Sequence, residues 1–137
     1  MEEYYMKIAL KLAKKALKYG EVPVGAIIVK DNKIISKAYN KKEKTHNTIK
    51  HAEIIAISKA CKKIKNWRLE NCEMYVTMEP CMMCSGAIEQ SRLKKIVYGV
   101  KNENYGYIHN LKNIKIISQI CENECKELVQ SFFKKRR

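Results

Sequence analysis

The pattern of hydrophobic and polar positions predicts a helix at the start of the chain, followed by a β-hairpin. In residues 4–19, apolar side chains recur at spacings of three and four with lysines on the opposite face, as in an amphipathic helix. Residues 22–29 are almost entirely apolar, which is typical of a strand buried on both faces. Asp31 and Asn32 favour a turn, so residues 33–39 are predicted to form the returning strand.

After the hairpin, helical and strand-like segments alternate to the end of the chain. Further helices are predicted at residues 51–64, 81–91 and 122–135, further strands at 73–78, 95–100 and 114–117, and loops at 40–50 and 102–110. This alternation indicates an α/β fold with a mixed five-stranded sheet and helices on both faces. We expect one domain over residues 1–137, with its ligand site at the carboxyl ends of the strands.

Two cysteines after the third predicted strand have the spacing of metal ligands. Cys81 and Cys84 form a Cys-x-x-Cys pair, which brings two sulfurs to one ion where the backbone turns into a helix, and Pro80 suits such a turn. His51, at the start of another predicted helix, is a candidate third ligand. Three protein ligands leave one position of a tetrahedral zinc ion open, and an open position is typical of a catalytic site.

Glu53 favours a catalytic over a structural zinc site. In a closed structural site, His46 or Cys72 would be the fourth ligand, and neither accounts for a glutamate two residues after His51. A carboxylate beside a metal-bound water is a candidate proton shuttle. Side chains at a helix start lean toward its N-terminus, so His51 and Glu53 can reach one centre there. The alternative for Glu53 is an acid that interacts with the helix dipole.

The combination of His51-Ala52-Glu53 with Pro80-Cys81-x-x-Cys84 is the signature of the zinc nucleoside and nucleobase deaminases. Further segments narrow the match. They are Glu21 to Ala26, Glu79 to Ala87, Ser91-Arg92 and Phe132-Phe133. From about Tyr4 to Arg137, the chain resembles the bacterial tRNA adenosine deaminases of the cytidine/deoxycytidylate deaminase superfamily, which convert a wobble adenosine to inosine.

This resemblance implies a three-layer α/β/α cytidine-deaminase-like fold and a zinc-dependent hydrolase. His51, Cys81 and Cys84 would bind one Zn²⁺ per subunit. Glu53 would take a proton from the metal-bound water, deliver it to N1 of adenine and later help to protonate the departing ammonia. The resemblance also implies a homodimer in which both subunits shape the site for a tRNA anticodon stem-loop.

Six substrate-binding residues are implied by the same resemblance. They are Pro23, Val24, Asn40, Met78, Asn102 and Phe133. Asn40 would hold the flipped nucleotide, Phe133 would pack against anticodon-loop bases, and the other apolar residues would line the pocket. Asn102 stands where the family often has aspartate, near the substrate's sugar, so we expect weaker discrimination between ribose and deoxyribose. The structural alternatives are a loop-initiating Asn40 and core positions for the apolar and aromatic residues.

Charge and cysteine content bear on partner and compartment. The chain has 28 basic and 14 acidic residues, and its net charge of +14 suggests a polyanionic partner, although an AT-rich genome also encodes many lysines. The tail from Lys134 to Arg137 suits phosphates or a solvated helix end. Six cysteines without an export signal indicate thiols and metal ligands, and no apolar run could cross a bilayer. We therefore expect a cytoplasmic protein without a membrane partner.

Two other functions remain open on the sequence. A deaminase of a free base or nucleotide, such as a guanine or cytosine derivative, would use the same metal chemistry. A zinc-stabilised RNA-binding module without catalysis would not need the glutamate that stands at position 53, Glu53. The net charge and the Phe132-Phe133 pair with its basic tail favour the RNA-directed enzyme.

Overall fold

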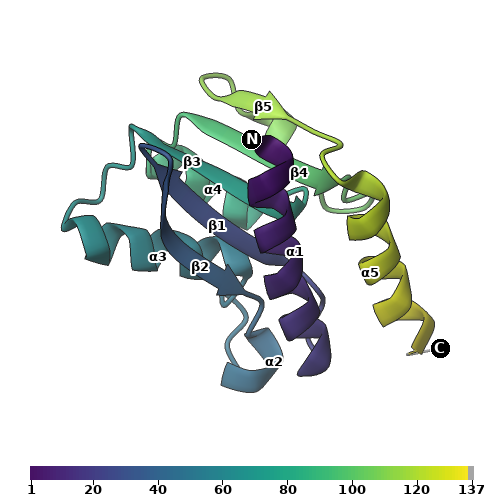
Figure 1. Ribbon diagram of the computed structural model, residues 1–137. Coiled ribbons are helices and arrows are strands. Elements are labelled where there is room, and N and C mark those ends of the chain that lie inside the picture. The colour runs from purple at the N-terminus through teal and green to yellow at the C-terminus, as the bar shows by residue number, and fades with distance from the viewer. Residues whose placement is uncertain (136–137) are drawn as a thin grey trace.

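The order of helices and strands predicted from the sequence is confirmed. The computed structural model describes residues 1–135, so Arg136 and Arg137 of the basic tail lie outside the described residues. The helices are α1 (Glu2–Lys18), α2 (Lys42–Thr45), α3 (Ala52–Ile64), α4 (Met82–Gln90) and α5 (Glu122–Lys135), with a 3₁₀ turn, η1, at Ile108–Asn110. The strands are β1 (Gly25–Lys30), β2 (Lys33–Tyr39), β3 (Cys72–Met78), β4 (Lys95–Val100) and β5 (Lys115–Ile117), as Figure 1 shows.

The five strands form one mixed sheet in the order β2-β1-β3-β4-β5. β1 pairs antiparallel with both β2 and β3, whereas β3, β4 and β5 are parallel to one another. Because β1 alone runs in the opposite direction, the start of β1 and the ends of β2, β3 and β4 lie at one edge of the sheet. The predicted five-stranded mixed sheet is therefore confirmed, and this edge is the one at which ligands of such sheets bind.

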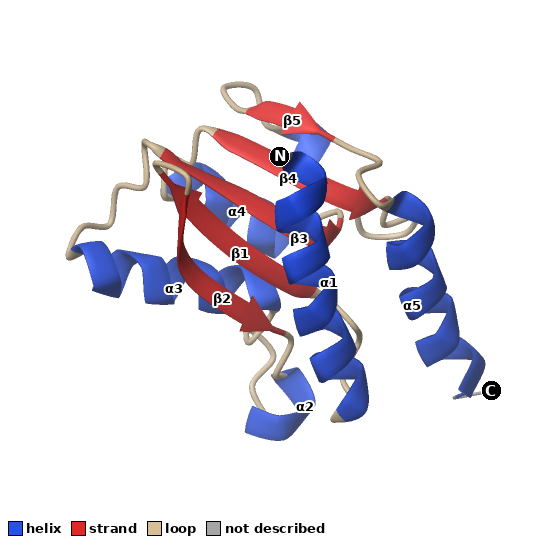
Figure 2. Ribbon diagram, in the orientation of Figure 1, coloured by secondary structure: helices blue, strands red, loops and turns tan. Residues whose placement is uncertain are grey.

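Helices cover both faces of the sheet and give the expected three layers. α1 and α5 lie on the face toward the viewer in Figure 2, and α3 and α4 lie behind the sheet. The contacts agree, since α1 packs on β1 and β3, α5 on β4, and α3 on β1 and β2. Among the helices that the structure describes, none combines the length and apolar character that a membrane-spanning helix requires.

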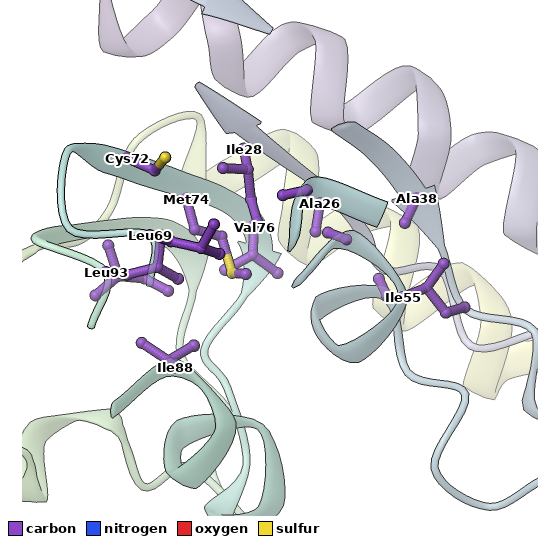
Figure 3. Packing of buried hydrophobic residues seen from close by; sticks show 14 of the residues in the cluster. Ala26, Ile28, Ala38, Ile55, Leu69, Cys72, Met74, Val76, Ile88 and Leu93 are labelled. Carbon is purple, nitrogen blue, oxygen red and sulfur yellow. The ribbon is translucent and has the colours of Figure 1, made fainter. Parts of the chain in front are cut away.

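Alternating side chains of the strands divide the core into two halves. Ile28, Met74 and Val76 pack toward α3 and α4, in the half of the core that Figure 3 shows. Ile27 and Tyr75, one position along their strands, pack toward α1 and α5. This is the reason that residues 22–29 read as one apolar run: successive side chains of a central strand point to opposite faces, and here both faces are covered.

Two local differences from the sequence prediction have clear causes. β1 begins at Gly25, because Pro23 has no N–H to donate and the N–H of Val24 bonds locally to the carbonyl of Val22 at 2.9 Å. The predicted loop at residues 40–50 contains the short helix α2, whose first N–H groups are hydrogen-bonded to a residue far away in the sequence. The buried carboxylate of Glu21 accepts hydrogen bonds from the backbone N–H groups of Glu43 and Lys44.

Replacing Gly25 with alanine is expected to lower the free energy of unfolding by about 3 kcal/mol. A Cβ atom at this position would lie 2.1 Å from the backbone oxygen of Ala9 and 2.7 Å from the backbone nitrogen of Ala13. These are backbone atoms of α1, so relief requires the helix to move away from β1. Urea denaturation followed by circular dichroism measures the change.

Gly86 provides the matched control for this substitution. It lies inside α4, and a Cβ there would meet nothing within 4 Å. Gly86→Ala should leave stability equal or raise it slightly, because alanine favours a helix over glycine. Equal stabilities for Gly25→Ala and the wild type would show that α1 does not need this close approach.

Candidate active site

The metal-ligand candidates lie at the starts of two helices that meet at one edge of the sheet. His51 is the N-cap of α3 and Cys81 is the N-cap of α4, and both have extended backbones (ψ of 151° and 179°). Neither side chain is used to cap its own helix. Two residues that are two positions apart within a helix point to opposite sides. His51 precedes the first helical residue of α3, so it is free of this constraint and can lie on the same side as Glu53.

His51, Cys81 and Cys84 converge on one point. Nδ1 of His51 lies 3.8 Å from Sγ of Cys81 and 3.5 Å from Sγ of Cys84, and the three ligand atoms all lie within 4.8 Å of one another. Among the described residues this is the group of histidine, cysteine and acidic side chains that could hold a metal ion, and it includes neither His46 nor Cys72. The geometry thus leaves the group with three protein ligands.

Hydrogen bonds among the three groups shift the pKa of each. The hydrogen bond from Cys84, followed by that from His51, lowers the pKa of the Cys81 thiol to about 4. The pKa of Cys84 is raised, because its proton is held in the hydrogen bond to Cys81 and the side chain is buried. The pKa of His51 is raised by its bond to Cys81. The cluster therefore favours the thiolate form of Cys81, and the thiolate is the form of cysteine that binds metals.

Glu53 lies beside this cluster with its side chain almost fully buried. It is in the first turn of α3 and only 4% exposed. Burial raises the pKa of its carboxyl group to about 7, against smaller opposing effects that include a hydrogen bond from Cys84. A carboxyl group with a pKa near neutrality can both accept and release a proton, which is the property that a general acid–base catalyst needs.

A cavity of about 520 Å³ opens over the cluster. Its walls come from the segment before β1, the ends of β2, β3 and β4, the loop after β4, and α5. The lining residues are Val22, Val24, Asn40, Lys42, His51, Glu53, Met78, Glu79, Cys81, Val100, Lys101, Asn102, Glu103, Asn104, Tyr105, Lys126, Val129, Gln130 and Phe133. A volume of this size suits a nucleobase or nucleoside.

Five of the six predicted substrate-binding residues line this cavity, namely Val24, Asn40, Met78, Asn102 and Phe133. Pro23 is buried and is absent from the lining, where its neighbour Val22 stands instead. Phe133 is 51% exposed at the rim, whereas Phe132 is buried, as expected for residues about 100° apart on a helix.

Asn40 also has a structural function at this edge. Its Oδ1 accepts a hydrogen bond of 2.8 Å from the N–H of Ala52, in the first turn of α3, and its Nδ2 donates one of 3.1 Å to the carbonyl of Val22. The amide thus joins the end of β2 to the start of the helix that bears Glu53. Each amide atom retains capacity for one more hydrogen bond.

Glu79 holds the loop that forms one rim of the cavity, a function that the sequence did not reveal. Its buried carboxylate accepts a hydrogen bond of 3.2 Å from the backbone N–H of Asn102. Oδ1 of Asn102 in turn accepts one from the N–H of Tyr105. Gly106 packs against Glu79, since a Cβ there would lie 2.4 Å from the carboxyl carbon. The loop is also joined to the cysteine motif by a bridge between Gly106 and Cys81.

Basic and polar residues of the lining were also missed by the sequence prediction. Lys126 and Gln130 line the cavity from α5, together with Phe133. Their spacing of four and then three residues places all three on one face of the helix, and this pattern could have indicated that α5 faces the site. Lys42 and Lys101 belong to segments whose position depends on tertiary contacts, so no local signal identified them.

Comparisons with known proteins match this chain to deaminases. The chain matches the MafB19-like deaminase family over residues 1–137. It is 40% identical to a tRNA-specific adenosine deaminase of Bacillus subtilis (strain 168), over 99% of this chain and 91% of the relative. It is 42% identical to a tRNA-specific adenosine deaminase of Aquifex aeolicus (strain VF5), over 99% and 96%. A structure from work on A-to-I editing by tRNA:A34 deaminases superposes with a TM-score of 0.86 at 30% identity, over 91% of this chain and 98% of the other.

Proposed function

Since the chain belongs to the family of tRNA-specific adenosine deaminases, we propose that it deaminates adenosine to inosine at the wobble position of a tRNA anticodon loop. Residues 1–137 would form a single catalytic domain. The observation that carries the proposal is the buried Glu53 carboxyl group beside His51, Cys81 and Cys84, within a cavity large enough for a nucleoside. An anticodon loop already presents unpaired bases, so little energy is needed to extrude one.

We propose zinc as the metal, one ion per subunit, because the donor atoms fit it. Zinc binds sulfur at about 2.3 Å and imidazole nitrogen at about 2.0 Å, so the donor atoms of a tetrahedral site are about 3.5 Å apart. The separations of 3.5 and 3.8 Å between His51 and the two sulfurs match this value. When bound, zinc supplies the Lewis acidity that makes water a nucleophile near neutral pH.

Glu53 would carry the protons of the reaction. It accepts the proton of the attacking water while a bond forms between the water oxygen and C6 of adenine. It then gives this proton to N1, takes the second water proton from the hydroxyl group now on C6 and passes it to the amino group, so that the C6–N6 bond breaks, the C6 carbonyl forms and ammonia leaves. One water is consumed and one ammonia released for each inosine formed, and the pKa of about 7 allows Glu53 to alternate between base and acid.

The other residues of the cavity would place the nucleotide. Val24 and Met78 provide apolar walls for the base, and Asn40 offers its remaining hydrogen-bonding capacity. Lys42, Lys101 and Lys126 can neutralise phosphates at the rim, and the exposed ring of Phe133 can stack on a neighbouring base. Pro23 is also a substrate-binding candidate, because its neighbours Val22 and Val24 line the cavity.

The family resemblance supports two further parts of the proposal. The chain would act as a homodimer in which both subunits shape the RNA site, and it would work in the cytoplasm, where tRNA is available. Light scattering during size-exclusion chromatography tests the dimer, and a molecular mass near 16.0 kDa, that of one chain, would contradict it.

Exposing total tRNA to the protein and sequencing it tests the function directly, because inosine is read as guanosine. A-to-G changes confined to the wobble position are the expected result, with release of one ammonia per change. Ammonia released from guanine or a cytosine derivative, with tRNA unchanged, would favour the free-base deaminase instead. Release from neither substrate would favour a non-catalytic RNA-binding module.

Asn102 is expected to permit turnover of single-stranded DNA. Its side chain lines the cavity, and an amide there lacks the charge of aspartate and adds a donor. We expect Asn102→Asp to lower the ratio of DNA to RNA turnover about tenfold, a factor that corresponds to the free energy of one hydrogen bond. Deamination of DNA and RNA oligonucleotides of one sequence measures the ratio, and undetectable DNA turnover by the unmodified chain would contradict the expectation.

A further inference from the structure

Two tyrosines and three lysines gather on the surface at one end of α1. The rings of Tyr19 and Tyr39 stack with centroids 6.3 Å apart and planes 18° apart. Nζ of Lys44 lies 5.2 Å from the centre of the Tyr19 ring, and those of Lys41 and Lys15 lie 4.9 and 5.8 Å from that of Tyr39. We call these five residues the tyrosine–lysine patch.

The charges of this patch are not neutralised within the described part of the chain. The ion pairs found within residues 1–135 join Glu2 and Glu73 to Lys94 and Lys95, which lie at the start of β4, at the opposite edge of the sheet. Glu21 is buried and already accepts two backbone N–H groups of α2. One exposed carboxylate, Glu43, belongs to the same segment as the lysines. The patch therefore keeps a net positive charge.

The patch is continuous with the cavity of the candidate active site. Tyr39 ends β2 and pairs with Gly25 at the edge of the sheet where the cavity opens, and the next residue, Asn40, lines the cavity. Lys42, beside Lys41, lines both the cavity and a neighbouring hollow of about 460 Å³ that also includes Gly20. In Figure 1, the ends of α1 and β2 lie next to α2, at one end of the molecule.

We propose that the tyrosine–lysine patch binds the substrate RNA outside the catalytic cavity, with one unpaired base stacked on Tyr19 and the adjoining phosphates bound by the lysines. Tyr19 is 50% exposed, so a base can stack on its ring when the Lys44 ammonium, 5.2 Å from the ring centre, turns to a phosphate. Aromatic rings accept any base, and lysines around them bind the backbone that carries it. This assignment rests on the proposed function, because it takes RNA to be the substrate.

Tyr19→Ala should weaken binding of a tRNA transcript about tenfold, the typical effect of losing one stacked base. KM for tRNA should rise by a similar factor, while kcat stays unchanged because the catalytic cavity is intact. Tyr4→Ala is the matched control, since Tyr4 is 61% exposed on the same helix at its other end. The control should bind tRNA as the wild type does.

The lysines are tested by salt dependence. Lys15→Gln with Lys44→Gln should reduce the slope of log binding constant against log salt by about 0.7 for each phosphate that the protein no longer neutralises. Lys7→Gln with Lys11→Gln removes the same charge from exposed positions elsewhere on α1 and should reduce it less. An unchanged slope, or an equal reduction by both pairs, would mean that the patch adds only general charge.

The outcomes separate this proposal from the proposed function. If the wild type forms inosine in tRNA but Tyr19→Ala leaves KM unchanged, the patch proposal fails and the proposed function stands. If the wild type forms no inosine, the proposed function fails, and the patch proposal, which rests on it, fails with it. Vesicles of phosphatidylserine and phosphatidylcholine serve as a second probe, and binding to them that depends on Tyr19, without an effect on RNA, would assign the patch to a lipid surface.

Discussion

Replacing Glu53 with glutamine is expected to reduce deamination by about 10³-fold or more, while the protein keeps its metal and its fold. Glutamine has nearly the same shape as glutamate but cannot accept the proton of water. It also suits the buried position, because burial already favours the neutral form of this side chain. Inosine formed in tRNA under single-turnover conditions measures the loss, and metal analysis with circular dichroism measures what is retained.

Glu70→Gln is the matched control for this experiment. Glu70 is exposed in the segment before β3, away from the edge of the sheet that bears the candidate site, and the chemical change is identical. Its activity should remain within about twofold of the wild type, as surface substitutions generally do. Near wild-type turnover by Glu53→Gln would remove Glu53 from the proton transfers and leave the proposed mechanism without a base.

The second large effect is expected from Cys84→Ser. The Cys84 side chain is fully buried, and its sulfur lies 3.5 Å from Nδ1 of His51. A serine hydroxyl does not ionise as a thiol does and is a poor ligand for zinc, so two protein ligands would remain. Metal content should fall from one ion per chain to less than about one-tenth. Inosine formation should become undetectable, and added zinc should not restore it.

Cys72→Ser distinguishes loss of a ligand from damage to the core. Cys72 is also buried, at 1% exposure, but it begins β3 at the opposite edge from the cluster. This variant can lose stability from its buried hydroxyl, yet it should keep its metal and its kcat. Full metal content in Cys84→Ser would show that this sulfur is not a ligand.

Much of the fold could be predicted because the signals for it are local. β2 and β4 have the predicted bounds, since polar residues flank the apolar part of each strand. The exposure of Phe133 beside a buried Phe132 follows from helix geometry alone. α1 begins earlier than expected, at Glu2, where acidic residues favour a helix start that the apolar pattern does not include.

The parts that could not be predicted depend on contacts between distant segments. α2 is held by Glu21, about 20 residues earlier in the chain, and four polar residues show no helical period by themselves. Glu79 stands out in the sequence only as part of a motif, because its bond to Asn102 joins two loops. The ligand and catalytic candidates were identified by residue type and spacing, whereas the shape of the cavity around them required the fold.

The packing of Gly106 on Glu79 indicates how the rim of the cavity could be redesigned. Libraries intended to change substrate range should vary residues 103–105, which are exposed and lie between two fixed points. Asn102 and Gly106 form these points, the first through its backbone bond to Glu79 and the second through its lack of a side chain. Loop grafts that keep both points preserve the position of the cysteine motif, so new specificity can be sought without rebuilding the reaction centre.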